Sequence, residues 1–220
     1  MDTLIQTVAV YALPVLFAIT LHEAAHGCIA YLFGDRTAYM LGRVSVNPTR
    51  HIDPMGTIVM PLILYFLTSG AFLFGFAKPV PVNFGQLRNP RWHGLLVTLA
   101  GPGCNFIQAL LWAIVSVALG ASGVTEPFFV QMANAGIMVN LVMCIFNLFP
   151  IPPLDGGRIV VALLPPKQGY AFSRIEPYGF YIVMALVITK LLTRYWLSPL
   201  MDVFFGVIRF LLMPLLLLLR

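Results

Sequence analysis

The chain has 220 residues, of which 60% are hydrophobic and only 10% are charged, and its mean hydropathy is +0.90. Soluble globular domains carry roughly 25% charged residues, so the composition excludes a soluble protein and indicates a polytopic membrane domain. The formal net charge of +5 comes from basic residues that stand singly in short polar loops. Such residues indicate orientation in a membrane, and no nucleic-acid partner is expected.

A membrane-spanning helix needs about 20 apolar residues, and six segments of the chain approach or exceed that length. These segments are residues 4–33, 55–77, 95–119, 131–149, 179–191 and 200–219. We therefore predict an all-α polytopic membrane protein with about five to six membrane segments. Short extended or β elements are expected in the loops, as a strand at Arg43–Val46 and as extended backbone around the prolines of Lys78–Asn83.

The basic residues also predict which side of the membrane each loop faces. Loops 34–54, 78–94 and 155–178 each contain three Lys or Arg residues, whereas loop 120–130 contains none. The first three are expected on the cytoplasmic side and the last outside. A full span over 55–77 would put the first two loops on opposite sides, so this segment is predicted to be re-entrant or a buried hairpin.

The first apolar segment contains an HExxH sequence at residues 22–26. Two histidines four residues apart share one face of a helix and can hold one Zn²⁺, while the glutamate between them can act on a bound water. Charged groups at membrane depth cost ~2.5–3.5 kcal/mol each on insertion scales, so they need a function and partners. The sequence therefore favours peptide hydrolysis at membrane depth over a pair of histidines that only pack between helices.

A catalytic zinc needs a third protein ligand besides the two histidines. Asp155 is the strongest candidate because it follows a helix end broken by prolines, where irregular backbone can carry a carboxylate into the membrane. From residue chemistry alone, a turn aspartate paired with Arg158 explains Asp155 equally well. The other candidates are expected out of reach, or in capping, solvated or interfacial roles: Asp35, His51, Asp53, His93 and Glu126.

With these motifs the chain resembles the site-2 protease family of intramembrane zinc metalloproteases, and in particular its compact prokaryotic members. The resemblance rests on the HExxH sequence, on AGPGCN at 100–105 and on NxxPxPxLDG at 147–156. The small residues of AGPGCN allow close helix packing, and Asn105 can hydrogen-bond a neighbouring helix.

The resemblance implies a zinc metalloendopeptidase with one Zn²⁺ per chain. His22, His26 and Asp155 would be the metal ligands, Glu23 the base that activates the zinc-bound water, and Asn147 an assisting residue. It further implies cleavage in or near the transmembrane segments of single-span membrane proteins. The expected location is the prokaryotic cell (inner) membrane, with the active site opening to the cytoplasmic side.

On this interpretation residues 1–220 form a single integral-membrane domain, with a catalytic core over about 4–160 and C-terminal helices over about 178–220. Asn147 would donate to an oxyanion or to the substrate backbone, or would only cap its own helix. The Lys78–Asn83 stretch would pair with an unwound substrate by β-augmentation, or would be an ordinary interfacial loop.

Other classes of function stay open at this point. A metal transporter would need further His, Asp or Glu along other spans, and the apolar segments after the first offer almost none. A proteolytically silent zinc-binding membrane adaptor would not need the intact set of catalytic residues. A membrane protease with zinc outside the lipid would use a distant Glu on a polar helix, and no such helix is evident. Substrate identity and oligomeric state do not follow from the sequence.

Overall fold

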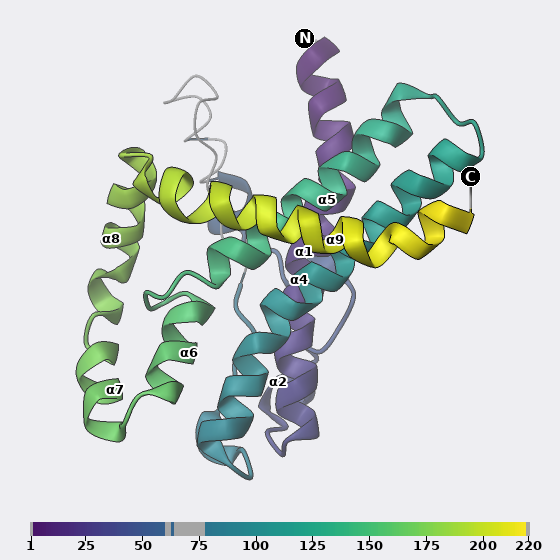
Figure 1. Ribbon diagram of the computed structural model, residues 1–220. Helices are drawn as coiled ribbons and strands as arrows, with labels where there is room; N and C mark the ends of the chain where they lie inside the picture. Colours follow the sequence, from purple (N-terminus) through teal and green to yellow (C-terminus); the bar gives the residue numbers. More distant parts are fainter. Residues whose placement is uncertain (1, 60–62, 64–77, 219–220) are drawn as a thin grey trace.

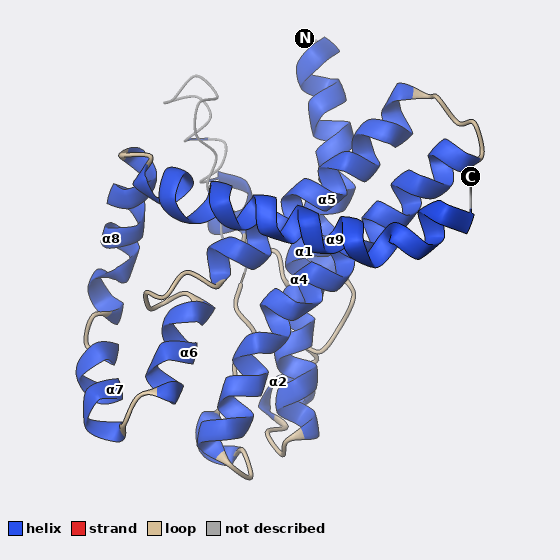
Figure 2. Ribbon diagram, viewed as in Figure 1, coloured by secondary structure: helices blue, strands red, loops and turns tan. Residues whose placement is uncertain are grey.

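The structure is a computed structural model that describes residues 2–59, 63 and 78–218. Over these residues the chain forms helices joined by loops, without a strand, as Figure 2 shows. The predicted all-α class is therefore confirmed. The strand expected at Arg43–Val46 is wrong, because this stretch is irregular, with bends at Val44 and Val46. They have a side-chain tether instead of a strand partner, since the Arg43 guanidinium donates to Lys78 O at 2.6 Å.

Long helices build the body of the molecule. They are α1 (Asp2–Leu32), α4 (Pro90–Ala121), α5 (Pro127–Asn147), α8 (Glu176–Ile188) and α9 (Ser198–Leu218). The short helices are α2 (Thr37–Met40), α6 (Asp155–Leu163) and α7 (Pro166–Ser173). Single turns complete the described chain: η1 (Pro48–Arg50), η2 (Pro54–Val59), η3 (Phe84–Gln86) and η4 (Thr193–Leu197).

Within the described residues, four helices are long and apolar enough to cross a membrane: α1, α4, α5, and α9 together with η4. The pair α7 and α8, bent by 63° at its break, makes a fifth if it counts as one span. The predicted segment 179–191 is thus α8, which begins earlier than expected. The predicted segment 55–77 lies mostly outside the described residues, and its re-entrant topology stays a prediction.

Local sequence signals set the ends of the helices next to the site. α4 begins where the Asn89 side chain accepts a hydrogen bond from Trp92 N, with Pro90 in the first turn, a position at which proline loses no helical hydrogen bond. α5 likewise begins with Pro127. It ends at Asn147, three residues before the first of the prolines that break the helix.

The core of the bundle consists of α1, α4 and α5, which pack along one another (Figure 1). Several side chains buried between them are small or amide-bearing, such as Ala18, Asn105 and Asn140, each with 0% exposure. Small residues let helix backbones approach closely where lipid offers no hydrophobic drive for association. α9 runs across this bundle and buries Ile208 and Leu212 against it.

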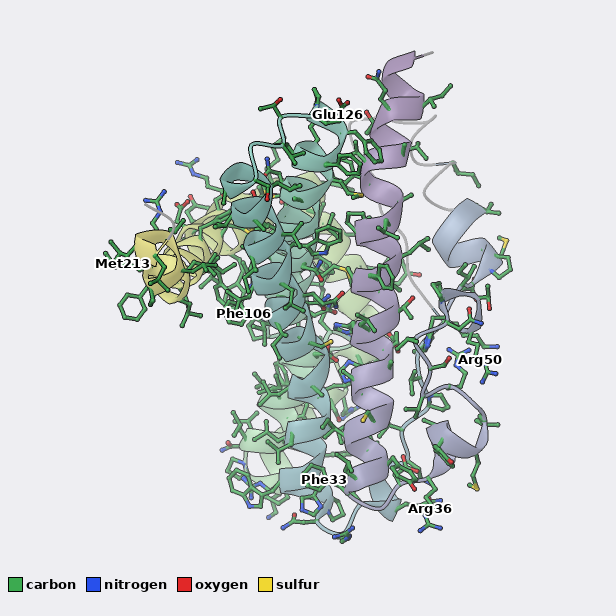
Figure 3. All side chains as sticks on the ribbon, turned by 90° about the vertical axis from the view of Figure 1, so that its right-hand side faces the viewer. Phe33, Arg36, Arg50, Phe106, Glu126 and Met213 are labelled. Atoms are coloured by element: carbon green, nitrogen blue, oxygen red, sulfur yellow. The ribbon has the colours of Figure 1, made fainter. Side chains whose placement is uncertain are left out.

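The two basic loops at 34–54 and 78–94 meet at one end of the bundle. Lys78 N donates to His51 O at 3.0 Å, and Asn83 N donates to Asp35 Oδ2 at 2.7 Å. Glu126, in the loop without basic residues, lies at the opposite end in Figure 3. The two loops therefore meet at the same end of the bundle, and the side of the membrane that this end faces stays a prediction.

Candidate metal centre

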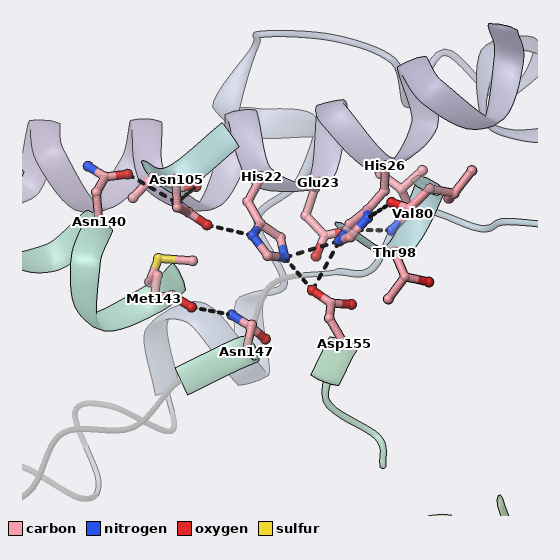
Figure 4. A network of polar contacts seen from close by, with 12 residues as sticks. His22, Glu23, His26, Val80, Thr98, Asn105, Asn140, Met143, Asn147 and Asp155 are labelled. Carbon is pink, nitrogen blue, oxygen red and sulfur yellow. Dashed lines mark hydrogen bonds and ion pairs between the residues drawn. The ribbon is translucent and has the colours of Figure 1, made fainter. Parts of the chain in front are cut away.

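Three predicted ligands from two distant helices converge on one point (Figure 4). His22 and His26 lie one turn apart on α1, and Asp155 is the first residue of α6. The distances from Asp155 Oδ2 to the two Nε2 atoms are 3.3 and 3.4 Å, and all ligand atoms lie within 4.8 Å of one another. No second group of three His, Cys, Asp or Glu residues with such spacing occurs among the described residues.

The chemistry of these donors fits a zinc ion. Asp155 Oδ2 is buried and accepts no hydrogen bond, although a buried carboxylate oxygen without a partner is costly. Two imidazole nitrogens and a carboxylate oxygen are a ligand set found in catalytic zinc sites, where a fourth position stays open for water. A bound cation would compensate the buried Asp155 charge.

Asn105 on α4 orients the first histidine. The His22 Nδ1–H donates to Asn105 Oδ1 over 2.6 Å. The Asn105 amide nitrogen in turn donates to Ala18 O and to Asn140 Oδ1, each at 3.0 Å, which identifies Oδ1 as the acceptor. This arrangement fixes the tautomer of His22 and leaves its Nε2 lone pair for a metal. The sequence predicted that Asn105 hydrogen-bonds a neighbouring helix. It did not predict that the partner on that helix is His22.

The second histidine is oriented by backbone. His26 Nδ1 lies 2.7 Å from Val97 O on α4. Because a carbonyl oxygen only accepts, His26 carries its proton on Nδ1 and presents Nε2 to the centre of the cluster. A backbone carbonyl leaves no mark in the sequence, so this contact could not have been predicted from residue types.

Gly101 explains why the AGPGCN sequence stands opposite the HExxH sequence. It lies one turn from both Val97 and Asn105, on the face of α4 that covers the two histidines. A Cβ added at Gly101 would overlap His26 Nε2 and would lie 2.6 Å from His22 Cε1. Only glycine therefore lets α4 come close enough for its neighbours to hydrogen-bond both imidazole rings.

The turn before α6 delivers Asp155 to this centre. The prolines at 150, 152 and 153 end α5 and prevent the helix from continuing. Gly156 then packs directly on this turn, where an added Cβ would overlap Leu148 O. The predicted alternative, a turn aspartate paired with Arg158, does not hold, because Arg158 pairs with Glu176 at 3.8 Å.

Glu23 and Asn147 border the same pocket, a space of about 160 Å³ that the three metal-ligand candidates also line. Glu23 Oε2 accepts a hydrogen bond from Val80 N at 2.7 Å. The Asn147 amide donates to Met143 O in its own helix at 2.9 Å. Asn147 thus makes the hydrogen bond within its own helix that a capping residue would make, and it also lines the pocket.

Asp35 has a structural role away from the metal centre, as a hydrogen-bond acceptor for two backbone amides. Its side chain is buried, and its two carboxylate oxygens accept hydrogen bonds from Thr37 N at 2.9 Å and Asn83 N at 2.7 Å. Burial opposes ionisation of Asp35, but these hydrogen bonds outweigh it and hold the pKa of the carboxyl below its ordinary value of 3.8. Asp35 therefore anchors the 78–83 segment to the end of α1.

The remaining candidates for a third ligand have local contacts as well. His51 Nε2 lies 2.9 Å from Ser45 O, and Asp53 Oδ1 accepts from Gly56 N at 2.8 Å. His93 accepts from Asn89 N and stacks on Phe33. Glu126 is exposed at the start of α5. None of the four belongs to the three-residue cluster found among the described residues.

Comparison with known proteins agrees with this geometry. Residues 121–189 match the family model described as Peptidase family M50. "Putative zinc metalloprotease YwhC" of Bacillus subtilis (strain 168) is 38% identical over 192 residues, which cover 85% of this chain and 83% of that relative. "Putative zinc metalloprotease Rip2" of Mycolicibacterium smegmatis is 30% identical over 190 residues, covering 86% of this chain and 70% of the relative.

A third relative is "Zinc metalloprotease MJ0392" of Methanocaldococcus jannaschii, 35% identical over 84 residues that cover 38% of this chain and 24% of that protein. No solved structure matches the chain significantly. The similarity to YwhC extends over most of both chains, and the described helices include several long and apolar enough to cross a membrane. The chain therefore belongs to Peptidase family M50, the site-2 protease family, and is a multi-pass integral-membrane zinc metallopeptidase.

Proposed function

We propose that the chain is an intramembrane zinc metalloendopeptidase that cleaves single-span membrane proteins in or near their transmembrane segments. The observation that carries the proposal is the position of the cluster. His22, Glu23 and His26 lie within α1, one of the apolar helices long enough to cross a membrane. Asp155 joins them there at 3.3 and 3.4 Å. A protease for soluble tails would have no reason to hold its ligands between apolar helices.

His22, His26 and Asp155 are the proposed ligands of the metal. They would hold a zinc ion, which would supply Lewis-acid chemistry: a lowered pKa for a bound water and polarisation of the carbonyl to be cut. Glu23 accepts the proton of the attacking water and then donates it to the amine of the leaving peptide. The hydrogen bond from Val80 N holds the Glu23 carboxylate on the side of the pocket, within the space that the ligands line.

Asn147 is the proposed donor to the developing oxyanion or to the substrate backbone. It lines the pocket, and its amide is held by Met143 O at 2.9 Å. To serve a substrate it must leave this carbonyl or use its second N–H. Removal of one such donor in other hydrolases costs about 10²–10³ in kcat.

The proposed orientation places the pocket toward the cytoplasm of a prokaryotic cell. The two basic loops that meet beside α1 support this orientation through the positive-inside tendency. The pocket is lined by residues of the second of these loops, Pro79, Val80, Val82 and Phe84, and by Arg158. Water would reach the centre from that side.

The first test separates catalysis from metal binding. Glu23→Gln keeps a side-chain acceptor for Val80 N but cannot take a proton. We expect this variant to bind zinc normally, measured by elemental analysis, and to lose cleavage of membrane-anchored reporters. In cells, proteomics of membrane fractions should show single-span proteins that accumulate with Glu23→Gln. Retained cleavage would refute the role of Glu23 and favour a silent adaptor or a different base.

The second test concerns the third ligand. Asp155→Ala should lower the zinc content of the purified protein, because two histidines alone leave the ion with too few protein ligands. Glu126→Ala is the matched control, since it removes an exposed carboxylate far from the cluster. If Asp155→Ala binds as much zinc as the control variant, the third ligand is another residue.

A further inference from the structure

The pocket around the metal-ligand candidates adjoins a larger cavity of about 560 Å³ between α4 and the helices α6 and α7. These helices stand beside the first half of α4 in Figure 1. Phe84, Thr98 and Arg158 line both spaces, so the two share a wall. We propose that this cavity is a substrate subsite that takes up the apolar side chains on one side of the scissile bond. The inference rests on the proposed function.

Size is the first reason. The pocket beside the histidines measures about 160 Å³, which leaves little room beyond the reacting peptide group. The neighbouring cavity falls within the range of roughly 300–1,000 Å³ that is usual for ligand sites. An unwound segment whose carbonyl lies beside His22 and His26 must place its next side chains somewhere. The shared wall makes this cavity the adjoining space.

The chemistry of the lining indicates which side chains fit. Most of the wall consists of apolar residues, among them Phe84, Val161 and Leu164. The charged residues in the lining are already engaged. Arg91 donates to the carbonyls of Ala162 and Leu163 at the end of α6, at 2.9 and 3.0 Å.

The other two charged residues in the wall, Arg158 and Glu176, pair with each other at 3.8 Å. The apolar majority of this wall would bury an apolar substrate side chain favourably, whereas a polar or charged side chain would lose hydration against it. The residues beside a bond cut within a transmembrane segment are apolar, which matches the proposed class of substrate.

Two residues on α6 allow the volume of the cavity to be changed in opposite directions. Ala162→Phe adds a ring inside the lining, and Val161→Ala removes two methyl groups from it. Ala171 on α7 is exposed and does not belong to the lining, so Ala171→Phe adds the same ring outside the cavity. Zinc content and thermal unfolding of each variant report whether the fold is intact.

The probes are synthetic single-span peptides with a Leu-Ala segment interrupted by one Asn-Pro pair. In these peptides the three positions on each side of the cleaved bond carry Ala, Leu or Phe. Cleavage by the full-length chain in detergent is followed by mass spectrometry. With Ala162→Phe we expect kcat/KM for Phe-bearing peptides to fall at least tenfold relative to Ala-bearing ones, on one side of the bond only. Val161→Ala should shift the preference toward Phe on the same side, and Ala171→Phe should leave the ratio unchanged.

A second measurement needs no turnover. In a Glu23→Gln chain whose native cysteines are replaced by alanine, Ala162→Cys should form a disulfide with cysteines placed on one side of the peptide's central bond. Ala171→Cys should not. If wild type cleaves no peptide but cross-linking is side-specific, the proposed function fails, while the cavity stands as a binding site for one side of the peptide's central bond. Equal slowing of all peptides by Ala162→Phe, no change of preference, or cross-linking that is absent or equal on both sides overturns the subsite.

Discussion

The hydrogen bond between His22 and Asn105 gives the sharpest quantitative prediction. Asn105→Leu keeps an apolar side chain of similar size but removes the acceptor 2.6 Å from His22 Nδ1. It also removes the donor to Ala18 O and to Asn140 Oδ1. Each buried polar group left without a partner costs about 1–3 kcal/mol, so the metal centre and the α1–α4 contact should both weaken.

The expected effect is a 10- to 100-fold loss of zinc affinity, the usual consequence of removing the partner of a metal-binding histidine. This corresponds to about 1.4–2.8 kcal/mol. The loss arises because the imidazole can then rotate or exchange tautomers. Asn105→Asp retains an acceptor for His22 and should stay within about tenfold of wild type, as carboxylate partners are common for such histidines.

Competition of the purified protein with a zinc chelator measures the affinity directly and does not depend on activity. Gln108→Leu is the matched control: the glutamine lies on the same helix, is also buried, and has a contact with Cys104 and none with the histidines. If Asn105→Leu and Gln108→Leu bind zinc equally well, Asn105 serves only helix packing and the assigned tautomer is wrong. Equal loss with Asp and Leu at position 105 would likewise refute the reasoning.

Two further predictions concern the packing of Gly101 and the ionisation of Asp35. Gly101→Ala should reduce the zinc content of the purified protein, because the new Cβ meets both imidazole rings. Gly103→Ala is the control and should bind zinc like wild type, because its added Cβ meets no neighbouring part of the chain within 4 Å. Equal zinc content in the two variants would contradict the close contact between α4 and the histidines. The lowered pKa of Asp35 means that its ionised form stabilises the fold at pH values above its ordinary 3.8, and that this contribution is lost as the pH falls below that value. Asp35→Asn should therefore lower the unfolding temperature at pH 7, and its difference from wild type should shrink toward pH 3; a constant difference would show that ionisation is irrelevant.

The grouping of His22, Glu23 and His26 could be predicted from sequence, because the HExxH spacing puts all three on neighbouring turns of one helix. Asp155 could be placed only as a candidate, since its approach to α1 depends on a turn that prolines break and Gly156 lets pack closely. The contacts that orient the histidines could not be predicted. They depend on how α4 lies against α1, and of the two partners only Asn105 carries a side-chain signal.

Loop structure was the weakest part of the prediction. Alternation at Arg43–Val46 suggested a strand, but in this loop the Arg43 side chain reaches across to Lys78 O and the backbone bends. Hydropathy identified the long helices well because their apolar runs have no competing interpretation. It could not show that α7 and α8 meet at 63°, since that angle depends on packing and on the residues at their junction.

Val80 stands between two prolines, and proline has no backbone N–H. Its amide is therefore the single backbone donor of residues 79–81, and Glu23 holds it at 2.7 Å. A peptide strand that paired along these residues could obtain a donor there only by taking it from the base. Such pairing would change the hydrogen bonding of Glu23 itself, so the arrival of a peptide along residues 79–81 and the position of the proposed base would be coupled through one N–H.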